Sequence, residues 1–435
     1  MKLSRNVIFT EIGQGEFIAA CTLTRAVIKL SAQGKADLER GDPSQLIELS
    51  LDDFQQCAEM KFLVDDQLDE RNWLSYLMNK DRLSPYDLTT FIAFTTECNF
   101  DCVYCYEKGQ VIKRTMTRTM LEKTVSWHQR KLERGNYKSC NINLYGGEPL
   151  TCVSLVLYFL DKMKVLTQSM GIKLKTRLLT NGYLLNKDIV EKLLPYGLIG
   201  VHVTIDGGRE THNVRRPLKN GRGTFDVVFN NLVAISKMNA GPEIECRISV
   251  DGSNINSIPE FLYFLKEKDV ASNIEPYFGF ITQTTSQFTR AESFCSRFVL
   301  GDDARAETIL GLYGEAKRIG FKIPDFFTLG PCMVVAEGAG VISPDGNIYK
   351  CLDMIGNDKL IVDNVNWDEP NPTYFDFLRA EYLDHCISTD CPFVPLCGTG
   401  CAMEAYLANG DFQQTICHRP MLEKINQGLL KLQFT

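Results

Sequence analysis

From residue 91 to residue 319, runs of β-prone apolar residues alternate with stretches of helical periodicity. Apolar residues that recur every three or four positions indicate amphipathic helices, so the pattern predicts six β/α units. Such units form a parallel sheet with right-handed crossovers, which makes a barrel or part of one. The predicted strands are Phe91–Thr96, Asn141–Tyr145, Lys173–Thr180, Ile199–Ile205, Glu243–Val250 and Asn273–Ile281. The predicted helices are Arg118–Leu132, Val153–Met170, Lys187–Leu194, Phe225–Met238, Ile258–Lys268 and Ala304–Ile319.

The first 88 residues have a different pattern, with short strands before short helices. Ser50 is a candidate cap for a helix over Asp52–Met60, and a second apolar stripe covers Asp69–Met78. This order predicts a winged-helix-like module whose sheet edge can bind an extended peptide as an added strand. The alternative is that the region only closes the bottom of the barrel. The predicted strands of this antiparallel meander are Val7–Glu11, Glu16–Thr22 and Ala26–Leu30.

The last hundred residues are rich in loops and cysteines. The turn Pro344–Asn347 separates two short β-prone runs, Val341–Ser343 and Ile348–Lys350, which predicts a hairpin. A loop-rich segment with so small a core needs metal or disulfides to be stable. Its seven cysteines are Cys332, Cys351, Cys386, Cys391, Cys397, Cys401 and Cys417.

Composition and charge narrow the classes of function. The net charge of -7, without a basic run, argues against nucleic acid as the main partner. The sequence begins with no charged and apolar leader and contains no apolar run of about 18 residues, so we expect a soluble, cytoplasmic protein without a membrane partner. Sixteen cysteines in such a chain favour metal or catalytic use over disulfides. Six scattered cysteines are expected to pack in the core: Cys21, Cys57, Cys140, Cys152, Cys246 and Cys295.

Three cysteines directly after the first predicted strand of the barrel suggest the chemistry. Cys98, Cys102 and Cys105 have the spacing C-x3-C-x2-C and can hold three irons of a 4Fe-4S cluster, which leaves the fourth iron open to a small molecule. The alternatives are structural zinc ligands or buried small apolar residues. A zinc ribbon needs a second C-x2-C or histidines, and no histidine lies between Glu107 and Trp127.

This motif resembles that of the radical S-adenosylmethionine (SAM) superfamily. The resemblance implies that the amine and carboxylate of SAM chelate the open iron, and that one electron cleaves SAM to a 5'-deoxyadenosyl radical. Tyr104, before the third cysteine, matches the position that packs beside the cluster and the adenine. After the second predicted strand, Gly146, Gly147 and Glu148 match the family's GGEP motif, which binds the amine of SAM.

Loops after later strands supply further candidates. By the same resemblance, Thr204 matches a residue that contacts the SAM ribose, and Arg215 matches an arginine near the SAM carboxylate. Asn181 and Asp206 fall in these loops and are candidates too, although Asn-Gly and Asp-Gly are also ordinary turn signals. We expect His212 to be structural, because no nucleophile pairs with it.

The C-terminal cysteines resemble those of the SPASM domain, which binds two auxiliary 4Fe-4S clusters. The resemblance assigns Cys332, Cys351 and Cys401 to the first cluster. Three ligands leave an iron that the thiolate of a substrate cysteine can bind, as in thioether-forming maturases, unless Cys295 or water completes the cluster. The family's second set begins with C-x2-C, whereas four residues separate the first two cysteines here. That second set is Cys386, Cys391, Cys397 and Cys417.

The sequence therefore predicts an α/β protein built on a partial (β/α)6 barrel of the TIM type. The expected domains are a winged-helix-like leader-recognition module at 1–88, a radical SAM barrel at 89–325 and a SPASM domain with auxiliary clusters at 326–435. Its expected activity is an intramolecular crosslink, a cysteine thioether, in a ribosomally synthesised precursor peptide. The partners are that peptide and an electron donor such as flavodoxin or ferredoxin. Alternatives are carbon-carbon crosslinking, an anaerobic sulfatase maturase that forms formylglycine, and an electron-transfer protein without SAM chemistry.

Overall fold

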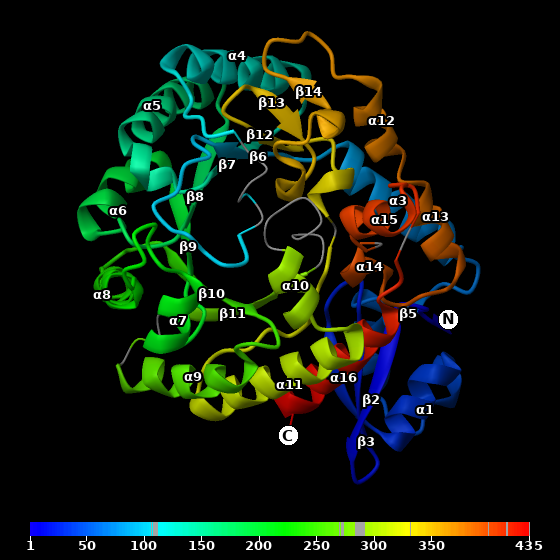
Figure 1. The fold of residues 1–435 in the computed structure, drawn as a ribbon. Helices are drawn as coiled ribbons and strands as arrows, with labels where there is room; N and C mark the ends of the chain where they lie inside the picture. Colours follow the sequence, from blue (N-terminus) through cyan, green and yellow to red (C-terminus); the bar gives the residue numbers. More distant parts are fainter. Residues whose placement is uncertain are drawn as a thin grey trace.

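A curved nine-stranded sheet organises the chain (Figure 1), with the order β11-β10-β9-β8-β7-β6-β12-β13-β14. The computed structural model describes residues 1–105, 107, 112–268, 270, 274–282, 292–330, 332–398, 400–414 and 416–434. The six predicted barrel strands are present and pair in parallel, as expected for β/α units. They are β6 (Asp87–Ala93), β7 (Ser139–Tyr145), β8 (Lys173–Thr180), β9 (Leu198–Thr204), β10 (Glu243–Val250) and β11 (Glu275–Phe280).

Two boundaries of the first and last barrel strands need comment. β6 begins four residues before its predicted start. It ends at Ala93, because the amide of Phe94 donates hydrogen bonds to the carbonyl oxygens of Ile92 and Tyr145. The loop that carries the cysteines therefore starts at Phe94. The predicted first residue of the last strand, Asn273, lies outside the described residues.

Helices cover the outer face of this sheet (Figure 1). All six predicted barrel helices are present, with ends within two residues of the prediction. The sequence pattern missed α7 (Arg209–Arg215) and α10 (Glu292–Phe298), since seven residues are too few to show a helical period. The predicted helices are α4 (Arg118–Arg134), α5 (Val153–Ser169), α6 (Lys187–Leu193), α8 (Phe225–Ser236), α9 (Ile258–Glu267) and α11 (Asp302–Ile319).

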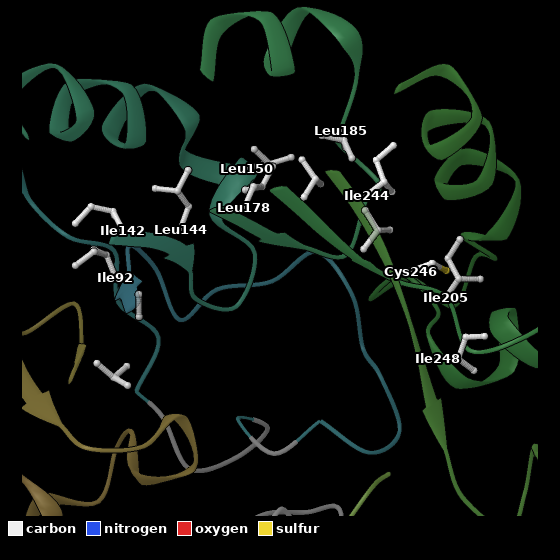
Figure 2. Packing of buried hydrophobic residues seen from close by; sticks show 14 of the residues in the cluster. Ile92, Ile142, Leu144, Leu150, Leu178, Leu185, Ile205, Ile244, Cys246 and Ile248 are labelled. Atoms are coloured by element: carbon white, nitrogen blue, oxygen red, sulfur yellow. The ribbon is translucent and has the colours of Figure 1, made fainter. Parts of the chain in front are cut away.

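The two faces of the sheet differ in polarity. On β7, Ile142 and Leu144 are buried against the helices, where Figure 2 shows them near Leu150 and Leu178. The polar residues that alternate with them along the strand are half-buried on the opposite face. On β10, Cys246 lies in the same apolar layer, in line with the packing role expected of scattered cysteines. The inner face is thus free to line a cavity.

The predicted C-terminal hairpin is confirmed and extends the barrel sheet. β12 (Ala339–Ile342) and β13 (Asn347–Tyr349) pair antiparallel, and β14 (Asp363–Asn364) follows β13. β12 also pairs in parallel with β6, so the sheet of the barrel continues past residue 326. The remaining helices are α12 (Pro372–Arg379), α13 (Glu381–Ser388), α14 (Val394–Cys397), α15 (Ala402–Asn409) and α16 (Arg419–Phe434).

The N-terminal region forms the predicted antiparallel meander, in the order β2-β3-β4. Ser50 caps the second helix through a capping box with Asp53. The sequence pattern missed the first helix and the short β1-β5 pair. None of the described helices is long and apolar enough to span a membrane. The elements are β1 (Lys2–Leu3), β2 (Val7–Gly13), β3 (Glu16–Cys21), β4 (Val27–Ser31), α1 (Ala32–Arg40), α2 (Leu51–Glu59), β5 (Leu63–Val64) and α3 (Glu70–Leu83).

Both faces of this small sheet are covered. On one face, Ala19 and Leu30 pack with residues of α1 and α2. On the other face, Ile8 and Ile18 pack with Leu422 and other apolar side chains of the C-terminal region. The N-terminal module is therefore an integral part of the fold.

One buried carboxylate fastens the loop between α1 and α2. Asp37 Oδ2 accepts hydrogen bonds from the backbone amides of Ile47, Glu48 and Leu49, at 2.9, 2.7 and 3.1 Å. Burial raises the pKa of this carboxyl group, but the three amides lower it more, and the net pKa lies well below its usual value. The anionic form is thus the form that stabilises the loop.

We predict that Asp37→Asn lowers the hydrogen-exchange protection of these three amides about tenfold at pH 7, because a charge-assisted acceptor is lost. A carboxyl group with a depressed pKa stabilises the folded state above its unfolded pKa of about 3.9, and this contribution is lost as the pH falls further. In the wild type, protection should therefore decrease below about pH 4, whereas the variant should lack this dependence. Equal protection in both proteins would contradict the assignment.

Candidate functional site

A cavity of about 440 Å³ opens at the C-terminal ends of the barrel strands. The thiols of Cys98, Cys102 and Cys105 all line it, as the sequence predicted for a single site. Two hydrogen bonds hold their loop to the end of α7 and the residues that follow it: the amide of Asp101 donates to Pro217 O at 2.8 Å, and the amide of Val103 donates to Arg215 O at 3.0 Å. Other lining residues are Tyr104, Gly146, Gly147, Asn181, Thr204, Arg216 and Arg247.

These thiols fit a cluster better than a single ion. Within the described ranges, no three His, Cys, Asp or Glu side chains converge where one metal ion could bind. In a 4Fe-4S cluster each cysteine ligates a different iron, so its ligands stand apart. Burial raises the pKa of all three thiols, that of Cys98 to about 12. A thiolate here needs a strong cationic partner, which iron provides.

The Gly-Gly-Glu segment is joined to the cysteine loop by its backbone. The amide of Gly147 donates to Thr95 O at 2.8 Å, and the amide of Glu148 donates to Glu97 O at 2.9 Å. A Cβ atom on Gly146 would stand 2.3 Å from Thr95 O, and one on Gly147 would stand 2.4 Å from Glu97 O. The glycines are thus required by the close approach of this loop.

Glu148 lies beneath the wall of the cavity. Its carboxylate accepts hydrogen bonds from the amide and hydroxyl groups of three partners: Thr180 Oγ1 at 2.8 Å, Asn181 N at 2.7 Å and Leu150 N at 3.0 Å. Burial raises its pKa, against the opposing effect of these bonds. The carboxylate ties two strand ends together, and its predicted contact with the amine of SAM stays a prediction.

The two arginines at the C-terminal end of α7 occupy different environments. Arg215 is buried in an ion network, with Asp206 at 3.1 Å and Asp251 at 2.8 Å, and it does not line the cavity. Arg216 lines the cavity, and its Nη1 donates to the hydroxyl of Tyr104 at 2.8 Å. Its Nε is buried without a hydrogen-bond partner among the described residues. Arg216, which the sequence did not point to, is therefore the one of these two arginines that lines the cavity.

Asp206 supports this wall from below. It accepts a hydrogen bond from the hydroxyl of Tyr104 at 2.5 Å, and it does not line the cavity. Burial raises the pKa of Asp206, but Arg215 and Arg216 lower it by more than burial raises it. The net pKa lies below its usual value, so the carboxyl group stays ionised. His212 is buried, which lowers its pKa to about 3, and its Nδ1 accepts from the amide of Asp206. A neutral, buried His212 agrees with its expected structural role.

Two other candidates do line the cavity. Asn181 donates to Asn99 Oδ1 at 2.7 Å and to the sulfur of Cys98 at 3.6 Å, and thereby links the third strand loop to the cysteine loop. Thr204 stands at the end of β9 on the cavity side. Their predicted contacts with SAM remain predictions.

The C-terminal cysteines form two groups. Cys332 and Cys401 line a second cavity of about 520 Å³. Cys351 is close to both, since burial first, and then Asp353 and these two thiols, raise its pKa well above its usual value. In the other group, Cys391 packs near Cys386 and Cys397, and it interacts electrostatically with Cys417. The arrangement follows the two predicted ligand sets, whose occupation by clusters stays a prediction.

The two cavities adjoin. Arg247, Phe280, Thr282 and Asp353 line both of them. Arg247 projects over Gly279, where a Cβ atom would stand 2.8 Å from its guanidinium carbon. A molecule in the first cavity can therefore reach toward Cys332 and Cys401.

Comparisons with known proteins identify the barrel. The family model described as Radical SAM superfamily matches residues 92–242. Fe-coproporphyrin III synthase of Methanosarcina barkeri is 26% identical over 179 residues, which is 40% of each chain, so the chain spans less than half of that relative. Radical SAM cyclopropyl synthase TigE of Paramaledivibacter caminithermalis is 25% identical over 137 residues, 28% of this chain and 27% of TigE.

Two solved structures share the fold. The first is anSMEcpe with bound AdoMet and the Cp18Cys peptide, with a TM-score of 0.58 at 19% identity over 80% of this chain and 97% of that chain. The second is Streptococcus suis SuiB, with a TM-score of 0.52 at 14% identity over 96% of this chain and 99% of SuiB. These two likenesses concern the fold, and the match to the Radical SAM superfamily model assigns residues 92–242 to a radical SAM domain.

Proposed function

We propose that the protein is a radical SAM peptide maturase that installs an intramolecular crosslink, a cysteine thioether, in a precursor peptide. The adjoining cavities support this proposal, because the three thiols of the barrel line one of them and Cys332 and Cys401 line the other. A peptide that spans both cavities would lie beside the residues that would hold the SAM-cleaving cluster and beside those that would hold the first auxiliary cluster.

Cys98, Cys102 and Cys105 are the proposed ligands of the cluster, which supplies the electron for cleaving SAM when it is bound. Arg216 is the proposed partner of the SAM carboxylate, since its side chain lines the cavity and carries a permanent positive charge. Tyr104 has its hydroxyl locked between Asp206 and Arg216, so its ring is held in one orientation at the cavity wall.

The N-terminal module is the proposed leader-binding site. Its sheet has β4 at one edge, where a peptide can add as a strand. The likeness to SuiB extends over 96% of this chain, against 80% for anSMEcpe, which supports a maturase that includes the module. The similarity to TigE, which is named a cyclopropyl synthase, supports a carbon-carbon crosslink as the alternative product.

Formylglycine formation is the second candidate. It is supported by the likeness to anSMEcpe, which was solved with AdoMet and a peptide bound. The two functions share SAM cleavage and differ in the peptide product.

The deciding experiment uses anaerobically reconstituted protein with SAM, dithionite and a candidate precursor peptide, chosen as a short cysteine-containing peptide from a neighbouring open reading frame. A peptide that loses two hydrogens and whose cysteine no longer alkylates supports the thioether, and an alkylatable cysteine indicates a carbon crosslink. An aldehyde-reactive product indicates formylglycine. Absence of 5'-deoxyadenosine from protein with a reducible cluster would sink the whole proposal.

We predict that Cys105→Ala reduces 5'-deoxyadenosine formation by at least a hundredfold, since two thiolates cannot retain the site-differentiated cluster. Cys140→Ala is the matched control, because Cys140 is buried on β7 outside the motif and should keep nearly full activity. An equal loss of 5'-deoxyadenosine formation in both variants would contradict the assignment of the three-cysteine motif as the cluster ligands.

The two arginines should give different losses. Arg216→Met should weaken SAM binding by about 10- to 100-fold, the cost of one or two charge-assisted hydrogen bonds, while the protein stays folded. Arg215→Met removes the buried ion pair of Asp251 and one of the two arginines beside Asp206, and should destabilise the fold by about 3–5 kcal/mol. Equilibrium dialysis and thermal unfolding separate these effects, and unchanged SAM affinity in Arg216→Met would reject its role.

A further inference from the structure

The N-terminal module and the C-terminal cysteine loops share one interface. We propose that the module positions the second cysteine set, by holding the turn 387–392 and with it Cys391. The inference rests on the proposed function, in which Cys386, Cys391, Cys397 and Cys417 bind an auxiliary cluster. It assigns Arg5, Arg71 and Leu74 as positioning residues for that cluster.

Charged groups hold the turn from one side. Asp390, directly before Cys391, has a left-handed backbone with φ of +54°. Arg71 grips its carboxylate with two bonds, from Nε at 2.9 Å and from Nη2 at 2.5 Å. Arg5 also pairs with Asp390, and its Nη2 donates to Ile387 O at 2.8 Å. Two arginines of the module therefore bind the turn at residues 387 and 390.

A further polar contact lies on the other side of the cysteine. The hydroxyl of Thr22, at the end of the module's sheet, donates to Pro392 O. The backbone carbonyls of residues 387 and 392 are thus both bound by the module. Cys391 lies between these two anchored positions, so its direction is set from outside its own segment.

Apolar packing holds the same turn from beneath. Leu74 of α3 is fully buried among Leu383, Ile387 and Val394, and Cys386 and Cys391 pack against this cluster. In an adjoining cluster, Ile8 and Ile18 pack with Phe393 and Leu396, and Cys391 and Cys397 lie beside them.

The cysteine loops need such support because they have little structure of their own. The helix that ends at Cys397 has four residues, and a helix of one turn is not stable alone. Ligands of a cluster must be held by their surroundings to bind in one geometry. An exposed ion pair alone contributes little, so the bidentate network and the buried leucine act together. Deleting the module should therefore affect the second auxiliary cluster as well as leader binding.

The test compares iron content and the electron paramagnetic resonance spectra of anaerobically reconstituted variants. Wild type with three clusters holds about twelve irons per chain. The double variant Arg5→Ala/Arg71→Ala and the single variant Leu74→Ala should each fall to about eight and lose one auxiliary signal, while both retain 5'-deoxyadenosine formation. The conservative variant Arg71→Lys should keep more of the auxiliary signal than the double alanine variant does, because lysine retains the positive charge. Arg209→Ala, which breaks an equally exposed pair with Asp226 on the barrel, is the control and should retain about twelve.

The possible failures can be told apart. Twelve irons and unchanged spectra in the variants would overturn the positioning role while leaving the proposed function intact. Four irons in the wild type would overturn the auxiliary clusters, and this inference with them. If the double variant does not fold, Asp390→Asn decides the matter, because Asn tolerates the left-handed backbone yet loses the charge that both arginines bind. An unchanged auxiliary signal in that variant would again reject the inference.

Discussion

The backbone contact between residues 95–97 and 146–148 is the constraint on which the site depends. Two amide-to-carbonyl bonds join the loops after β6 and β7, and only glycine fits where they meet. Glu148 carries the link to the end of β8 through Thr180 and Asn181, and Asn181 returns to Cys98. Three strand ends thus form a closed ring, and the cysteine loop is held on a rigid base before any ligand binds.

The rest of the fold brings a second set of thiols to this ring. The sheet buries its apolar face under helices and turns its polar face inward, so the interior can admit a ligand. β12 pairs with β6 and continues the sheet into the C-terminal region, from which Cys332 and Cys401 line the second cavity. This pairing explains why the two cavities adjoin, because the barrel and the C-terminal region share one sheet. Arg247 lies where the cavities meet.

Much of this arrangement was predictable from sequence, because periodicity of apolar residues reflects which face is buried. The barrel strands and their helices, the cap at Ser50 and the grouping of Cys98, Cys102 and Cys105 all follow from such local signals. The parallel pairing of β12 does not, since a hairpin signal reports only the pairing of its own two strands. Nor can two adjacent arginines reveal which one faces a cavity; that depends on Asp206 and Asp251, which are close to Arg215 only in the fold.

The measurement that tests this account most directly is the effect of Gly147→Ala on cluster retention and SAM affinity. Gly208→Ala is the matched control, because a Cβ atom there meets no other atom within 4 Å. The account predicts that Gly147→Ala forces the two loops apart, loses the SAM-binding cluster signal and weakens SAM binding by at least tenfold, while Gly208→Ala behaves as wild type. A Gly147→Ala protein that keeps both its cluster signal and its SAM affinity would contradict the claim that the loop contact builds the site.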